Sequence, residues 1–148
     1  MITGKIKAIS ISTKKGIPKN NVPTAKLIKN HGIEGDAHAG DWHRQVSLLA
    51  MESVNKMKEK GLEAIQPGDF AENLTTEFID IPNLLIGTKV RIGDALLEIT
   101  QIGKECHHHC AIYQELGDCV MPREGIFAKT LAGGNIAVGD AIEIINEN

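Results

Sequence analysis

The sequence predicts a mainly β domain, because short apolar segments alternate with polar residues, Gly-Asp pairs offer tight turns, and only one window has helical periodicity. Closing such a sheet into an antiparallel β-barrel, fully or in part, would remove its exposed edges. The 148 residues suffice for one domain over positions 1–148 with a single core, and are too few for two.

The N-terminal part is expected to begin with a strand. From residue 2 to residue 11, Ile6 and Ala8 alternate with lysines, as in a strand with one buried face. Two prolines, a glycine and several polar residues predict a loop over 13–24. A second short strand is expected at 26–28.

The best helix is predicted from about Ser47 to Lys60. Leu49, Val54 and Met57 recur at three-to-four spacing, and lysines gather late in the segment, where positive charge suits the helix dipole. Gly61 is then expected at the C-terminal cap.

Two similar segments near the C-terminal half predict hairpins. In the first, at 84–103, Gly93-Asp94 lies between two apolar stretches, as in a two-residue turn. The second, at 135–145, repeats the pattern around another Gly-Asp pair. Two copies indicate similar hairpins and not a repeat architecture.

Composition and charge argue against several classes of protein. A formal net charge of −3 argues against a general nucleic-acid or membrane-surface binder. No apolar run approaches the roughly 20 residues of a membrane span, and the N-terminus lacks the apolar region of a signal peptide. Three clustered cysteines predict reduced thiols and a cytoplasmic protein, and not a disulfide framework.

The chemistry-bearing residues concentrate in the segment 102–129. Cys106 and Cys110 have a spacing compatible with a zinc site, which His107, a neighbouring histidine or Cys119 would complete. Alternatively, nearby cationic groups would favour a reactive thiolate, able to act as a nucleophile and sulfur carrier. A third interpretation is that these are ordinary buried thiols.

A second candidate site is the glycine-rich loop at 35–44. Its glycines allow backbone N–H groups to approach a ligand, while His38, His43 and Arg44 offer donors to an anion. The alternative is a tight turn in which Asp36 and His38 bond only to the local backbone.

Taken in order, these pieces resemble the MOSC domain, named for the C-terminal domain of molybdenum cofactor sulfurase. The motifs that carry the resemblance are GIEGDAHAG with WHRQVSLLA at 32–50, PGDFAENL at 67–74, LLIGTKVRIGDALLEITQIG at 84–103 and ECHHHCAIYQELGDCVMPREGIFA at 105–128. Each is weak alone and specific as an ordered set. The resemblance implies a β-barrel core with a few peripheral helices.

The resemblance also implies a role around the molybdenum cofactor, or in handling sulfur for metal–sulfur centres, with one key cysteine. Cys110 fits the family position by its distance to Gly117, and Cys106 is an additional thiol upstream. The chain resembles the small stand-alone members and lacks the desulfurase domain of full sulfurases. Any sulfur would therefore come from another protein.

The leading hypothesis is a protein that binds molybdopterin or molybdenum, with Cys110 or Cys106 carrying persulfide or ligating the metal. The groups expected to hold the anionic part of the ligand are His38, His43 and Arg44, assisted by Arg123. Asp36 and Asn73 are also expected among the cofactor-binding residues. Such a protein would be a sulfur transferase or carrier, served by a sulfur-donor or molybdoenzyme partner. The alternatives are a non-catalytic cofactor- or oxyanion-binding module and a zinc-stabilised barrel. In the first hypothesis both cysteines, with Cys119 beside them, lie close to the loop at 35–44.

Overall fold

The computed structural model describes residues 3–15, 17–61, 64–103 and 124–145, and in them the chain is mainly β. The elements are β1 (Thr3–Ile11), β2 (Asn20–Val22), β3 (Thr24–Ile28), β4 (Gly32–Ile33), β5 (Val46–Ala50), α1 (Met51–Glu59), β6 (Leu74–Glu77), the 3-10 turn η1 (Ile81–Asn83), β7 (Lys89–Ile92), β8 (Ala95–Ile102), β9 (Ile126–Ala132), β10 (Gly134–Ala137) and β11 (Ala141–Ile145).

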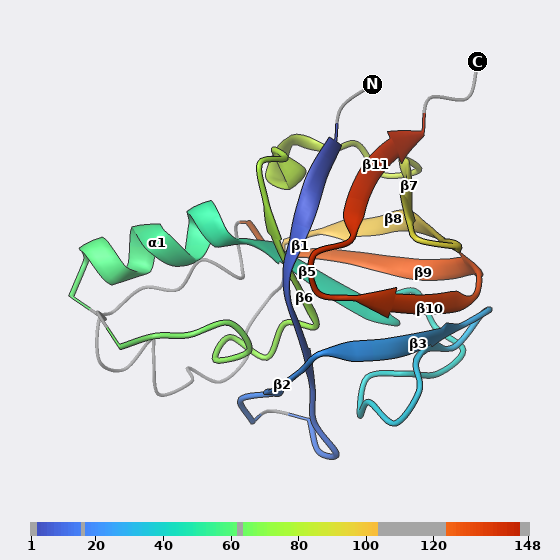
Figure 1. The fold of residues 1–148 in the computed structure, drawn as a ribbon, viewed down its shortest axis with the longest axis horizontal. Coiled ribbons are helices and arrows are strands. Elements are labelled where there is room, and N and C mark those ends of the chain that lie inside the picture. The colour runs from blue at the N-terminus through green and yellow to red at the C-terminus, as the bar shows by residue number, and fades with distance from the viewer. Residues whose placement is uncertain (1–2, 16, 62–63, 104–123, 146–148) are drawn as a thin grey trace.

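The strands form a closed barrel, as predicted. Its strand order is β11-β7-β8-β9-β5-β6-β1, and pairing between β1 and β11 closes the ring. Figure 1 shows these strands wrapped around a common interior, with α1 to one side. All pairs around the ring are antiparallel except β5 and β6, which are parallel. Parallel neighbours need a crossover connection, which α1 and residues 60–73 provide.

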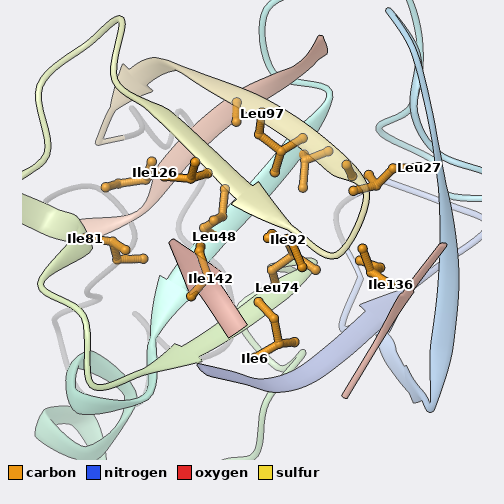
Figure 2. Packing of buried hydrophobic residues seen from close by; sticks show 14 of the residues in the cluster. Ile6, Leu27, Leu48, Leu74, Ile81, Ile92, Leu97, Ile126, Ile136 and Ile142 are labelled. Carbon is orange, nitrogen blue, oxygen red and sulfur yellow. The ribbon is translucent and has the colours of Figure 1, made fainter. Parts of the chain in front are cut away.

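Aliphatic side chains from nearly every strand fill the barrel. Figure 2 shows this cluster, in which Ile6, Leu48, Leu74, Leu97 and Ile126 meet from five different strands. Each of these side chains is fully buried. On β1, buried Ile6 and Ala8 alternate with exposed lysines, in agreement with the predicted strand.

The predicted helix begins too early in the sequence. Residues 46–50 form β5, and α1 starts at Met51. Every residue of β5 is buried, because Leu48 faces the barrel interior while Leu49 packs outside it with Val54 and Met57 of α1. A strand buried on both faces loses the period-two pattern, and its apolar run merges with the helical pattern that follows.

The end of α1 agrees better with the prediction. Lys60 is the C-cap residue, and its N–H donates to the carbonyl groups of Lys56 and Met57. Gly61 follows with a φ of +126°, a conformation that favours glycine. The short strand expected at 26–28 is confirmed as part of β3.

Of the two predicted hairpins, the first is confirmed. Ile92 of β7 pairs with Ala95 of β8 across Gly93-Asp94, and Gly93 has a φ of +55°. The second is wrong: β10 pairs with β3 in a separate three-stranded sheet with β4, whereas β11 pairs with β1 and β7 of the barrel. The corner at 138–140 is held by β1, since Gly139 N–H donates to the Ile6 carbonyl and Ile6 N–H to the Asp140 carbonyl.

None of the helices in the described part of the chain is long and apolar enough to span a membrane.

Candidate functional site

The loop between β4 and β5 carries four of the residues that the sequence singled out: Asp36, His38, His43 and Arg44. Its start is a tight turn, in which the Asp36 N–H donates to the Ile33 carbonyl and Gly35 has a φ of +84°. The structure divides these side chains into two neighbouring groups. Asp36 and His38 share a buried lysine, while Arg44 lies between aromatic rings.

The buried lysine is Lys19, which is only 4% exposed and precedes β2 directly. Its Nζ lies 2.8 Å from Asp36 Oδ1, 2.9 Å from His38 Nδ1 and 3.0 Å from Ser12 Oγ. Asp36 also accepts the Ser12 backbone N–H at 3.1 Å through Oδ1 and the His38 N–H at 3.1 Å through Oδ2. The interpretation in which Asp36 and His38 bond only to the local backbone is therefore wrong.

Asp36 is ionised in this environment. Burial by itself would raise the pKa of its carboxyl group, but the hydrogen bond and positive charge of Lys19 outweigh that effect, helped by the Ser12 N–H and the Asn73 amide. The net result is a pKa below the usual value for aspartate. The side chains of both Asp36 and Lys19 are inaccessible to solvent, so this is a buried ion pair.

Asn73 is a buried residue whose side-chain amide joins β1, β5 and the start of β6 by hydrogen bonds. Its Oδ1 accepts the Ser47 backbone N–H at 3.0 Å and the Ser47 hydroxyl at 3.2 Å, and its Nδ2 donates to the Ser10 carbonyl at 3.0 Å. Ser10 belongs to β1, Ser47 to β5, and Asn73 directly precedes β6. Because the amide is fully buried and bonded on both sides, its contacts support the barrel end that carries the loop.

The second group is built around Arg44. Its guanidinium carbon lies 4.8 Å from the centre of the Trp42 ring and 5.5 Å from that of Phe127. Lys15 Nζ lies 4.8 Å from the same indole, whose N–H donates to the His38 carbonyl at 2.7 Å. Trp42 thus connects the two groups. Among the described residues, the buried Arg44 Nε has no hydrogen-bond partner.

His43 takes a different direction from His38. Its Nε2 lies 2.8 Å from Gln101 Oε1 at the end of β8, and its carbonyl accepts the Thr100 hydroxyl. The imidazole is exposed and stands edge-on to Trp42, with ring centres 5.9 Å apart. His43 is therefore available at the surface beside the Arg44 group, and not inside the lysine cluster.

Glu72 was not among the site residues predicted from the sequence, and its buried carboxyl group has a raised pKa, in contrast to that of Asp36. Burial raises the pKa of its carboxyl group, although the N–H groups of Gly68 and Phe70 and the Thr75 hydroxyl partly offset that effect. Its oxygens accept the Phe70 N–H at 3.2 Å and the Thr75 hydroxyl at 3.1 Å.

The remaining predicted site residues, namely Cys106, Cys110, Cys119, His107 and Arg123, lie outside the described residues, so their proposed proximity to the loop at 35–44 stays a prediction. Within the ranges that the structure describes, no group of three or more His, Cys, Asp or Glu side chains is arranged to hold a metal ion.

Two surface hollows lie on other parts of the molecule. One, of about 460 Å³, is lined by β3, β10 and Asp140. The other, of about 390 Å³, lies between the start of α1 and residues 78–82, and Glu124 lines it. Glu124 accepts hydrogen bonds from Ser53 at 2.7 Å and from Lys56 at 2.9 Å. Neither hollow is lined by the groups around Lys19 and Arg44, whose chemistry makes them the stronger candidate site.

Comparison with known proteins finds a family model that matches most of the chain. The family model described as "MOSC domain" matches residues 34–143, a span that includes the loop, Asn73 and the cysteine segment. No curated protein is significantly similar in sequence. Among solved structures, the YuaD protein of Bacillus subtilis has a TM-score of 0.81 at 19% identity, covering 96% of this chain and 95% of that one.

Two further solved structures share the fold. YiiM from Geobacillus stearothermophilus has a TM-score of 0.75 at 18% identity over 97% of this chain and 75% of that one. YiiM from Escherichia coli has a TM-score of 0.68 at 18% identity over 97% and 71%, respectively. At these identities the likeness establishes the fold alone.

Proposed function

The chain belongs to the MOSC domain family, and from that premise we propose that it binds the molybdenum cofactor or a related oxyanion at the loop 35–44 and carries sulfur on a cysteine thiolate. The family is linked in general to the C-terminal domains of molybdenum cofactor sulfurases. The observation that carries the proposal is the Arg44 guanidinium, held beside two aromatic rings with its buried Nε lacking a partner among the described residues.

An anionic group fits these residues. A buried guanidinium nitrogen without a partner is costly, and a phosphate or oxyanion would satisfy it with a charge-assisted hydrogen bond. Trp42 and Phe127 restrict the guanidinium plane, so less side-chain entropy is lost on binding. His43, exposed beside Trp42, and Lys15, above the same ring, add donors on the surface side.

The Asp36–Lys19 pair supports the anion site without opposing it. Asp36 is ionised, but its charge is compensated by Lys19 and by two backbone N–H groups, and its side chain is inaccessible. The carboxylate therefore orders the loop, while Arg44 and His43 remain for the ligand. Asn73 contributes by fixing the strands below the loop.

The cysteines would supply the soft ligand or the sulfur-carrying group. Cys110, or Cys106, would accept sulfane sulfur from a donor persulfide: the thiolate attacks the outer sulfur, a new S–S bond forms, and the donor leaves as its own thiolate. When bound, the cofactor supplies a redox-active, sulfur-ligated metal. Arg123, which follows the cysteines in sequence, would assist in holding the anion.

Calorimetry with molybdate, and separately with phosphate, tests the anion site. Losing one charge-assisted contact should weaken binding to Arg44→Ala roughly tenfold or more. The affinity of Arg44→Lys, which keeps the charge and loses the planar guanidinium, should lie between those of the wild type and Arg44→Ala. Arg91→Ala, at an exposed position of β7, is the matched control and should bind like the wild type. Equal affinities of wild type and Arg44→Ala would refute the assignment.

Mass spectrometry tests the sulfur step. After incubation with a cysteine desulfurase and cysteine, the wild type should gain one sulfur that a thiol reductant removes. Whichever of Cys110→Ser and Cys106→Ser fails to gain the sulfur identifies the carrier, and Cys119→Ser is the control. No gain in the wild type would leave a binding module without sulfur chemistry, and stoichiometric zinc in the purified protein would favour the zinc-stabilised barrel.

A further inference from the structure

The hollow between the start of α1 and residues 78–82 combines an apolar lining with negative charge. Its volume is about 390 Å³, and Phe78, Ile79 and Pro82 supply much of its apolar surface. Its charged lining residues are three acids and one lysine, namely Glu52, Asp80, Glu124 and Lys56. Negative charge around an apolar hollow favours a partner that carries positive charge next to an apolar group.

Phe78 presents its ring to solvent from a fixed position in this hollow. The residue is 72% exposed, and its φ of +66° is uncommon for a residue with a side chain. The Phe78 N–H donates to the Glu52 carboxylate at 3.0 Å, so the first turn of α1 holds this conformation. The fold thus maintains a disfavoured backbone conformation and leaves a large apolar ring in water, where a molecule from outside can cover it.

Glu52 and Asp80 provide the negative charge that a partner can reach. Both residues are exposed. A carboxylate can accept about four hydrogen bonds, whereas in the described part of the chain Glu52 accepts one from Phe78 and Asp80 accepts one from Asn83. Glu124 is already engaged with Ser53 and Lys56 and is not needed as a free acceptor.

We propose that this hollow is a docking surface for a protein partner that inserts an arginine or lysine next to an apolar side chain, and that this partner is the sulfur donor. The identity of the partner as sulfur donor rests on the proposed function, whereas the docking surface does not. A cation above the Phe78 ring would gain a cation–π contact and would pair with Glu52 or Asp80. The adjacent apolar side chain would cover Pro82.

Glu124 connects the hollow with the cysteines. It follows the three cysteines in sequence, and its carboxylate accepts hydrogen bonds from Ser53 at 2.7 Å and from Lys56 at 2.9 Å of α1. A partner seated in the hollow would therefore contact the residue that immediately follows the segment 104–123. This connection is the reason for identifying the partner as the protein that delivers sulfur to a cysteine.

Nuclear magnetic resonance titration with short peptides tests the surface without any sulfur chemistry. Acetyl-Leu-Arg-amide should shift the backbone signals of Ser53 and Phe78, and acetyl-Leu-Glu-amide should not. Phe78→Ala should weaken binding of the arginine peptide roughly fivefold or more. Leu85→Ala, at a position that is 76% exposed and outside the hollow, is the matched control and should bind like the wild type. Equal shifts by the two peptides, or equal affinities of wild type and Phe78→Ala, would overturn the docking surface.

The double variant Glu52→Gln and Asp80→Asn tests the charge. An amide oxygen can still accept the hydrogen bonds from Phe78 and Asn83, so the shape of the hollow is kept while two negative charges are lost. The variant should bind the arginine peptide more weakly and with a smaller dependence on salt, whereas Asp94→Asn, in the β7–β8 turn, should bind like the wild type. Equal affinity of acetyl-Gly-Arg-amide and acetyl-Leu-Arg-amide would show a site for a lone cation and would contradict the docking of an apolar side chain.

The rate of sulfur gain separates the docking role from the proposed function. With a cysteine desulfurase as donor, Phe78→Ala should gain sulfur roughly fivefold more slowly than the wild type. With glutathione persulfide, whose outer sulfur is transferred as the glutathione thiolate leaves, the two rates should be equal because a small donor needs no docking surface. Equal rates with the desulfurase, or a decrease with both donors, would refute the role of the hollow in sulfur delivery. If the wild type gains no sulfur from either donor, the sulfur-carrying function fails together with the identity of the partner, and the peptide titration still decides the docking surface.

Discussion

Replacing Asn73 by alanine tests whether this residue supports the barrel, because the contacts of its amide allow a magnitude to be worked out. The side chain makes three buried hydrogen bonds, two to Ser47 and one to the Ser10 carbonyl. Each is worth about 1 kcal/mol net, and truncation also leaves the Ser47 N–H and the Ser10 carbonyl buried without these partners. We therefore expect a loss of roughly 3–5 kcal/mol in the free energy of unfolding.

A loss of that size is a large share of the roughly 5–15 kcal/mol that stabilises a typical domain. Urea unfolding, followed by the fluorescence of the single tryptophan, Trp42, would measure it. Asn83→Ala is the matched control, since Asn83 is exposed and, among the described residues, its side-chain amide donates to Asp80 at 2.7 Å, so the loss of stability should stay within about 0.5 kcal/mol. Equal stabilities of Asn73→Ala and Asn83→Ala would refute the reasoning. Weakened molybdate binding by a stable Asn73→Ala would instead make Asn73 a ligand contact.

Three further substitutions probe the surroundings of this cluster. Because the pKa of Asp36 is lowered, its carboxylate stabilises the fold above the unfolded pKa of about 3.9, and this contribution is lost as pH falls through the folded pKa. Asp36→Asn should therefore reduce the fall of the urea unfolding midpoint at acid pH. Parallel curves of midpoint against pH for wild type and variant would contradict this. The raised pKa of Glu72 gives the opposite pH dependence of stability, since its stabilising contribution is complete below the unfolded pKa and is lost as pH rises through the folded pKa. Glu72→Gln should therefore gain more over the wild type near pH 8 than near pH 4, and a constant difference would be evidence against this assignment. At Gly68, with a φ of +96°, an added Cβ would lie 2.4 Å from the Lys19 carbonyl oxygen, so Gly68→Ala should lose about 2 kcal/mol or more. Gly87→Ala, with a φ of +94° and open space, should lose only about 1 kcal/mol, and similar losses at the two glycines would show that crowding at Lys19 is unimportant.

The sequence predicted those parts of the fold that local patterns determine. The β7–β8 hairpin is such a case, because a Gly-Asp turn and its flanking strands lie within one short segment. The matching Gly-Asp pair at 139–140 has the same local pattern, yet the chain there leaves the small sheet and enters the barrel. Contacts with β1 decide that outcome, and they come from the far end of the sequence.

The error at the start of α1 has a related cause. Periodicity reports how many faces of an element are buried, and α1 itself covers the outer face of β5. When a helix packs on the strand that directly precedes it in sequence, the apolar residues of the two elements form one continuous pattern. The boundary was therefore set by tertiary packing that no residue near Ser47 reveals.

The candidate site shows the same division between local motif and distant support. Asp36 and His38 could be chosen from the sequence because they stand in one glycine-rich motif, whereas Lys19 stands between a proline and an asparagine in a segment predicted as a loop. Its burial depends on Gly68, whose carbonyl accepts the Lys19 N–H at 2.8 Å and whose missing side chain leaves room for the Lys19 carbonyl. The PGDFAENL motif thus provides both Gly68 and Asn73, one supporting Lys19 and the other the strands below it. A substitution within this motif should therefore lower the stability of the fold through these internal contacts.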